Sequence, residues 1–83
     1  MNKQLIQAIL NTLSLIGDRA LPLAVIASQV RGSVVLAVTD EAVLGALRFC
    51  QEQGWIERRV DTIDQSEMWY LVDAGRIAMR SHR

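Results

Sequence analysis

Apolar residues recur at helical spacing near the start of the chain. Over residues 2–16 they form one broad stripe, made of Leu5, Ile6, Ile9, Leu10, Leu13 and Ile16. This spacing predicts an amphipathic helix. Gly17 directly follows the stripe, and glycine readily adopts the left-handed backbone conformation that ends many helices. We therefore expect the first helix to end at this glycine.

The next stretch, residues 19–32, predicts a shorter second helix. Pro22 fits its first turn, where the missing N–H has no helical partner to lose, and Gly32 is expected to end it. Residues 33–38 read SVVLAV, which is apolar and rich in β-branched side chains. At this length periodicity does not separate a short buried strand from a tucked loop, so both remain open.

A third helix is predicted from residue 40 to about Gln53. Thr39 or Asp40 is expected to cap its first turn, because both side chains accept hydrogen bonds from free N–H groups. Its inner face is the apolar series Val43, Leu44, Leu47 and Cys50. Gly54 then supplies the residue expected to end the helix.

From Trp55 onwards the apolar period shortens from about 3.6 to 2, which is the period of a strand. Residues 55–60 and 68–72 are rich in strand formers and flank the polar, turn-prone residues 61–67. They predict an antiparallel hairpin, followed by a last helical turn and a basic, frayed end over residues 73–83. Because a hairpin is not stable alone, it must rest on the helices. We expect one α+β domain spanning residues 1–83.

Composition and charge exclude several classes of function. The 83 residues contain nine Lys and Arg against nine Asp and Glu, so net charge gives no general attraction to nucleic acid or membrane. Cys50 and His82 are expected on different elements, and neither a glycine-rich phosphate loop nor a metal-ligand spacing is present. We therefore expect no enzyme activity, cofactor or metal. Without a signal peptide or an apolar run long enough to span a bilayer, we expect a cytoplasmic protein with no membrane partner.

Two segments of the chain resemble the winged helix-turn-helix family of DNA-binding domains, in the form found in small bacterial regulators. Residues 47–59, LRFCQEQGWIERR, are similar to the end of a recognition helix that passes through glycine into the first wing strand. Residues 69–76, WYLVDAGR, are similar to the second wing strand and a Leu-Thr-x-x-Gly-Arg turn, with Val72 where threonine is usual. The resemblance implies a three-helix winged helix-turn-helix fold with a C-terminal β-hairpin wing. Residues 33–38 depart from it, because the family joins its second and third helices by a short turn.

The resemblance also implies where DNA would bind. The third helix would enter the major groove and the wing would touch the DNA backbone or minor groove. Arg48, on the outward face of that helix, is expected to contact a base, and Thr39 a phosphate or a base edge. Arg58 and Arg59 are expected to meet phosphates.

Acidic residues lie beside all of these candidates. We interpret Asp40 and Glu41 as helix-capping acids that match the helix dipole. For Arg58, a cross-strand ion pair with Glu67 is an alternative to a phosphate contact.

The resemblance implies a transcriptional regulator that binds double-stranded DNA. If Arg48, Arg58 and Arg59 alone neutralised phosphates, each protomer would make about three phosphate contacts, with a salt slope of only about −3. A homodimer on a two-fold site would double this, and we expect it to form through the helix at residues 2–16. The surface proposed for it comprises Leu5, Ile9 and Leu13 on one side and Leu15 on the other.

Two alternatives to DNA binding remain open. In the first, the protein is a winged-helix protein–protein interaction module whose acidic face, Asp40, Glu41 and Glu52, meets a basic partner. In the second, it is an accessory subunit of a nucleic-acid complex in which a partner supplies the basic surface.

Overall fold

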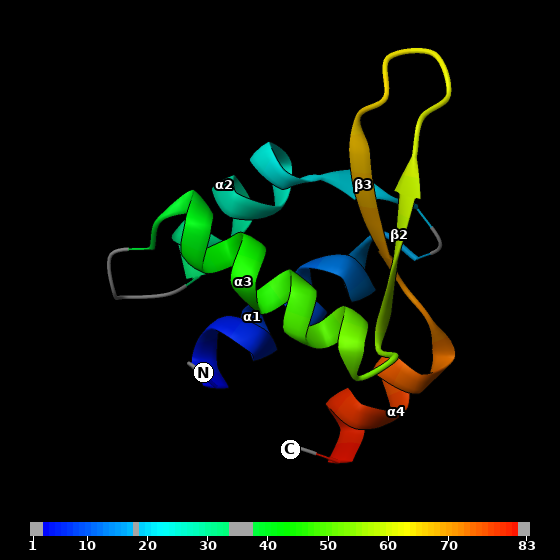
Figure 1. Ribbon diagram of the computed structural model, residues 1–83. Helices are drawn as coiled ribbons and strands as arrows, with labels where there is room; N and C mark the ends of the chain where they lie inside the picture. Colours follow the sequence, from blue (N-terminus) through cyan, green and yellow to red (C-terminus); the bar gives the residue numbers. More distant parts are fainter. Residues whose placement is uncertain (1–2, 18, 34–37, 82–83) are drawn as a thin grey trace.

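The computed structural model describes residues 3–17, 19–33 and 38–81. In chain order the elements are α1 (Lys3–Leu15), β1 (Leu21–Pro22), α2 (Leu23–Ser33), α3 (Asp40–Glu52), β2 (Ile56–Val60), β3 (Glu67–Leu71) and α4 (Asp73–Ser81) (Figure 1). The strands form one antiparallel sheet in the order β1-β3-β2. The fold is therefore α+β, with a hairpin after the third helix as predicted. No helix in the described ranges is long and apolar enough to cross a membrane.

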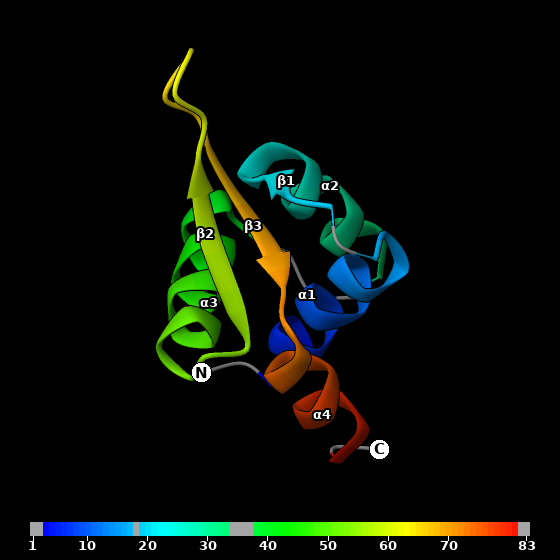
Figure 2. The same ribbon diagram turned by 90° about the vertical axis from the view of Figure 1, so that its right-hand side faces the viewer.

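The helices are arranged on two sides of the molecule. Figure 2 shows α3 on one side, α1 and α2 on the other, and the β2–β3 hairpin projecting beyond all three. We call this hairpin, residues 56–71, the wing. The core lies where the three helices meet the base of the sheet, and its largest fully buried side chains are Ile9, Leu10, Leu13, Ile26, Val30, Val43, Leu47, Cys50 and Ile56. Trp69 and Leu71 close the core from the sheet side.

The start and the end of the second helix differ from the prediction. Pro22 is not in the first turn of α2 but in β1, where it pairs with Met68 while Leu21 pairs with Trp69. Proline is compatible with the edge of a sheet because it has no N–H to donate. Gly32 does not end α2, since the helix continues to Ser33. Ser33 is thus helical rather than part of a strand, and most of the 33–38 stretch lies outside the described residues.

Both ends of α3 follow the predicted chemistry. Thr39 is the N-cap, and its Oγ1 accepts a hydrogen bond from the Ala42 N–H at 3.1 Å. Gly54 has φ +78°, the left-handed conformation expected after a helix. Of the predicted inner face, Leu44 is only half-buried, while the other three side chains are buried. This face fixes the rotation of α3 about its own axis, and so decides which residues it presents to solvent.

The C-terminal segment is a complete helix rather than a single frayed turn. α4 spans Asp73–Ser81 and packs against α1. Its first turn lies against the backbone at Trp55, whose carbonyl accepts a hydrogen bond from the Val72 N–H at 3.2 Å. A β-carbon at Gly75 would lie 2.2 Å from that same carbonyl oxygen, so only glycine permits the approach. Gly75 therefore allows the first turn of α4 to lie directly against the Trp55 backbone.

Candidate nucleic-acid interface

The outward face of α3 carries the residues that the sequence predicts for it. Glu41, Gly45, Arg48 and Glu52 are all exposed. Arg48 and Arg58 line one open hollow of about 400 Å³, together with Gln51 and Glu52. The fold therefore brings together one arginine from the helix and one from the wing, which lie ten positions apart in the chain. Such a pair could bind two groups of one DNA strand.

Arg58 lies on the face of the wing that looks toward this hollow, and it is already in an ion pair. Its Nη1 donates to Glu67 Oε1 at 3.2 Å, diagonally across β2 and β3. This is the cross-strand pair that the sequence offered as the alternative. Both side chains are nearly half exposed, at 46% and 47%, and such a surface pair contributes under about 1 kcal/mol. A phosphate can therefore compete with Glu67 for the guanidinium group.

Arg59 lies on the opposite face of the wing, so the structure does not bring it together with Arg48. Its guanidinium carbon is 5.5 Å from the centre of the Tyr70 ring, a cation–π distance. The Tyr70 hydroxyl donates to Glu57 Oε2. That hydrogen bond is the main reason that the pKa of Tyr70 is raised above 10.0. Arg59, Tyr70 and Glu57 thus form one polar cluster on the outer face.

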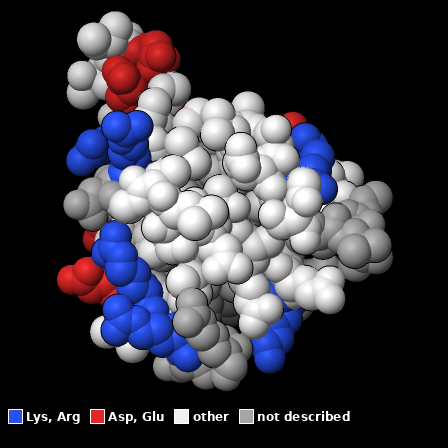
Figure 3. Space-filling view, turned by 180° about the vertical axis from the view of Figure 1, so that it is seen from behind, with Lys and Arg blue, Asp and Glu red and all other residues white. Residues whose placement is uncertain are grey.

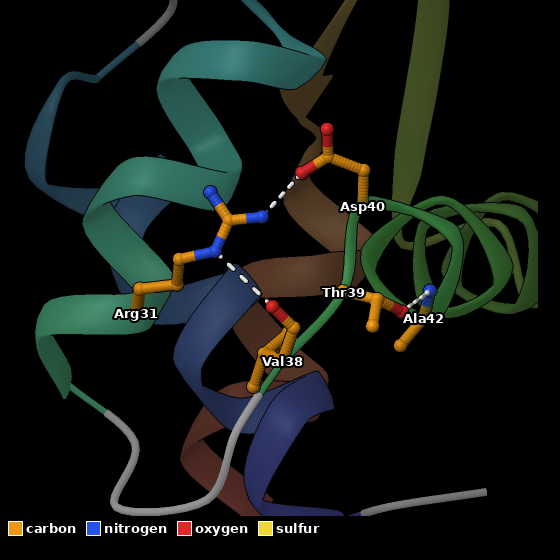
Figure 4. A network of polar contacts seen from close by, with 5 residues as sticks. All are labelled: Arg31, Val38, Thr39, Asp40 and Ala42. Atoms are coloured by element: carbon orange, nitrogen blue, oxygen red, sulfur yellow. Dashed lines mark hydrogen bonds and ion pairs between the residues drawn. The ribbon is translucent and has the colours of Figure 1, made fainter.

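The start of α3 is held by a residue that sequence reasoning missed. Arg31, in the last turn of α2, donates from Nε to the Val38 carbonyl at 3.1 Å and from Nη2 to Asp40 Oδ1 (Figure 4). The only signal in the sequence is an arginine in the last turn of one predicted helix and an acid at the start of the next. Asp40 is therefore an acid in the first turn of α3 and half of an ion pair, while Thr39 rather than Asp40 is the N-cap. Thr39 accepts from Ala42 as its cap, and its own O–H remains able to donate to a phosphate.

The tip of the wing has no basic residue. Asp61 Oδ1 accepts from the Ile63 N–H at 2.7 Å, and Asp64 Oδ1 accepts from the Ser66 N–H at 2.9 Å. The bonds from Ser66 lower the pKa of Asp64 below 3.8. Both acids thus shape the turn, and Ile63 projects from it with 93% of its surface exposed. The basic groups of the wing lie along its strands rather than at its tip.

The face opposite α3 is largely uncharged. Figure 3 shows this face, with Lys and Arg gathered at its edges and mostly uncharged residues across its centre. Leu15 is 86% exposed and Val25 40% exposed there, beside a hollow of about 290 Å³ between α1 and α2. The surface expected for a dimer differs from the prediction. Leu5, Ile9 and Leu13 are buried inside their own protomer, so only Leu15 of that set is available.

Cys50 is a core residue, as the sequence suggests. It is fully buried, and burial is the main cause that raises the pKa of its thiol to about 11. Within the described part of the chain no three His, Cys, Asp or Glu side chains are grouped as metal ligands would be.

No protein-family model and no curated protein matches the chain. Solved structures do. A MarR-family transcriptional regulator from Silicibacter pomeroyi is 25% identical with a TM-score of 0.78, and the match covers 95% of this chain and 48% of that one. A single-residue mutant of S. aureus MepR is 22% identical with a TM-score of 0.75, and the match covers 98% of this chain and 54% of that one. The zinc-responsive MarR family member ZitR of Lactococcus lactis is 22% identical with a TM-score of 0.68, and the match covers 99% of this chain and 51% of that one.

The chain thus spans about half the length of these proteins, and within that half its helices, sheet and wing follow theirs. It is a winged helix-turn-helix domain with the fold of the MarR-family transcriptional regulators.

Proposed function

We propose that this protein is a transcriptional regulator that binds double-stranded DNA through α3 and the wing. The observation that carries the proposal is the open hollow that Arg48 of α3 and Arg58 of β2 both line. In winged-helix proteins the third helix enters the major groove while the wing follows the backbone. The hollow lies where these two contacts would meet. A bacterial regulator of this kind would act in the cytoplasm.

Each candidate residue has a role that fits its place. Arg48 would donate two hydrogen bonds to a guanine, the commonest specific contact in the major groove. Arg58 would exchange Glu67 for a phosphate, and Arg59 would reach a phosphate from the outer face of the wing. Thr39 would donate its hydroxyl proton to a phosphate beside the first turn of α3.

A role as a protein–protein interaction module is less favoured. That alternative needs an acidic patch made of Asp40, Glu41 and Glu52 to attract a basic partner. The Asp40 carboxylate is already paired with Arg31, so the patch has less net charge than the sequence suggests. The solved structures that share the fold include a MarR-family transcriptional regulator.

We further propose that the protein forms a homodimer through the largely uncharged face of α1 and α2. Leu15 projects beside the hollow between these helices, so a two-fold contact would place each Leu15 against the partner's hollow. This face lies on the side of the molecule away from α3 (Figure 2). Such a dimer would point its two α3 helices in opposite directions, and would not double the contacts on one duplex.

Binding to mixed-sequence duplex DNA at low salt tests the proposed function. We expect the double variant Arg48→Ala, Arg58→Ala to bind at least about tenfold more weakly than the unchanged protein, because two arginine contacts are lost. The matched control is Lys3→Ala, Arg80→Ala, which removes the same charge from α1 and α4 and should keep the affinity. The absence of duplex binding by the unchanged protein at about 100 micromolar would refute the proposal.

A further inference from the structure

Arg31 joins the end of α2 to the start of α3 through two separate bonds. Nε is bonded to the Val38 carbonyl and Nη2 to the Asp40 carboxylate, so one guanidinium group spans the backbone before the N-cap and the first residue of the helix (Figure 4). The Arg31 and Asp40 side chains are 47% and 65% exposed. The pair is therefore at the surface, where an approaching polyanion meets it.

Asp40 is poorly placed for DNA binding unless its charge is cancelled. It is the first residue of α3, and the N-terminal end of a recognition helix is the part that contacts base edges. A free carboxylate there would repel the phosphates on either side of the groove. The Arg31 guanidinium group supplies the opposite charge directly at this carboxylate.

Two nitrogens of the Arg31 guanidinium group already have acceptors within the protein, so the group points at the entry to α3 instead of away from it. We propose that Arg31 is a positioning residue that neutralises Asp40 and holds the entry of α3, without itself contacting DNA. The inference rests on the proposed DNA-binding function. It explains how an acid can occupy the leading end of a helix that enters a groove.

Charge rescue tests the electrostatic part of this inference. Binding to a randomised duplex pool is measured at several salt concentrations for Arg31→Ala, Asp40→Asn and the double variant. We expect Arg31→Ala to bind about tenfold more weakly, because it leaves a like charge facing phosphates. Asp40→Asn alone should bind no more weakly than the unchanged protein. The double variant should return to within about twofold of the unchanged protein, because neither charge remains.

The salt slope separates positioning from direct contact. If Arg31 only neutralises Asp40, the double variant keeps the slope of the unchanged protein. A direct phosphate contact by Arg31 would instead reduce the magnitude of the slope by about 0.9 in the double variant. That reduction would overturn the inference. So would a double variant that binds as weakly as Arg31→Ala, or an Arg31→Ala variant that binds as tightly as the unchanged protein.

Amide exchange measures the holding role without DNA. The Ala42 and Val43 N–H groups bond to Thr39 at 3.1 Å each, so they report on the N-cap that Arg31 holds in place. Both amides should exchange severalfold faster in Arg31→Ala and in the double variant. Arg31→Lys should keep duplex affinity within about threefold, because it keeps the positive charge. Its Ala42 and Val43 amides should still exchange faster, because lysine lacks the two guanidinium nitrogens that bond to Val38 and Asp40 together. If the unchanged protein bound no duplex, the proposed function would fail, and unchanged exchange in Arg31→Ala would separately overturn the holding role.

Discussion

Neighbouring arginines in the wing have different surroundings because successive residues of a strand face opposite sides. Arg58 faces the hollow beside α3 and pairs with Glu67, whereas Arg59 lies against Tyr70 on the outer face. Each has a partner reached diagonally across the β2–β3 ladder. The strand pairing therefore determines which side chain each arginine contacts. A phosphate would have to displace Glu67 from Arg58 on one face and the Tyr70 ring from Arg59 on the other.

The hydrogen bond between Tyr70 and Glu57 leads to a prediction at this scale. Tyr70 is the only tyrosine in the chain, so the absorbance of tyrosinate reports this residue alone. We expect Glu57→Gln to lower the pKa of Tyr70 toward 10.0, because the carboxylate that stabilises the protonated phenol is removed. A pH titration of both proteins measures it, with Glu67→Gln as the control that should leave the tyrosine unchanged. Identical titration curves for Glu57→Gln and the unchanged protein would show that this hydrogen bond does not form in solution.

At the scale of elements, Gly75 determines how α4 joins the domain. Replacement by alanine should lower the free energy of unfolding by about 1–3 kcal/mol, because the added β-carbon would overlap the Trp55 carbonyl and the Leu71 side chain. The matched control is Gly45→Ala in α3, where a β-carbon meets nothing within 4 Å. That change should raise the free energy of unfolding by about 0.5–1 kcal/mol, the usual gain of alanine over glycine inside a helix. Chemical denaturation of both variants checks the opposite signs, and two shifts in the same direction would contradict this packing.

The sequence predicts those elements whose apolar period and end residues both lie within the element or next to it. α1, α3 and the wing each combine an apolar period with an end residue, Gly17 or Gly54 or a polar turn. β1 has only two residues, and its pairing with β3 is a long-range contact that no local pattern contains. The close approach of α4 to the Trp55 backbone is equally non-local.

The same limit applies to the candidate interface. Periodicity predicts that Arg48 faces outward, because this follows from the position of the residue within its own helix. The bond from Arg31 to Asp40 depends on how α2 and α3 meet, so the sequence could not assign Arg31 a role.

At the scale of the whole molecule, the two exposed faces have different chemistry. The α3 side carries Arg48 and Arg58. The α1–α2 side is largely uncharged (Figure 3), and Leu15 and Val25 line its hollow. Because the nine positive and nine negative charges cancel overall, attraction to DNA must come from local arrangement rather than from net charge.

Self-association through the uncharged face is the prediction that belongs to this scale. We expect the average mass in sedimentation equilibrium to rise with protein concentration, and Leu15→Asp to abolish the rise because it places a charge in the apolar contact. Ile63→Asp is the matched control, since Ile63 is equally apolar and 93% exposed but lies at the tip of the wing. Because the dimer points its α3 helices apart, and because Arg58 and Arg59 are the two arginines proposed to contact phosphates, the salt slope of duplex binding should stay at about −2 in all three proteins. A monomeric mass for the unchanged protein at high concentration would exclude the dimer, and a slope near twice that value would exclude this arrangement of its helices.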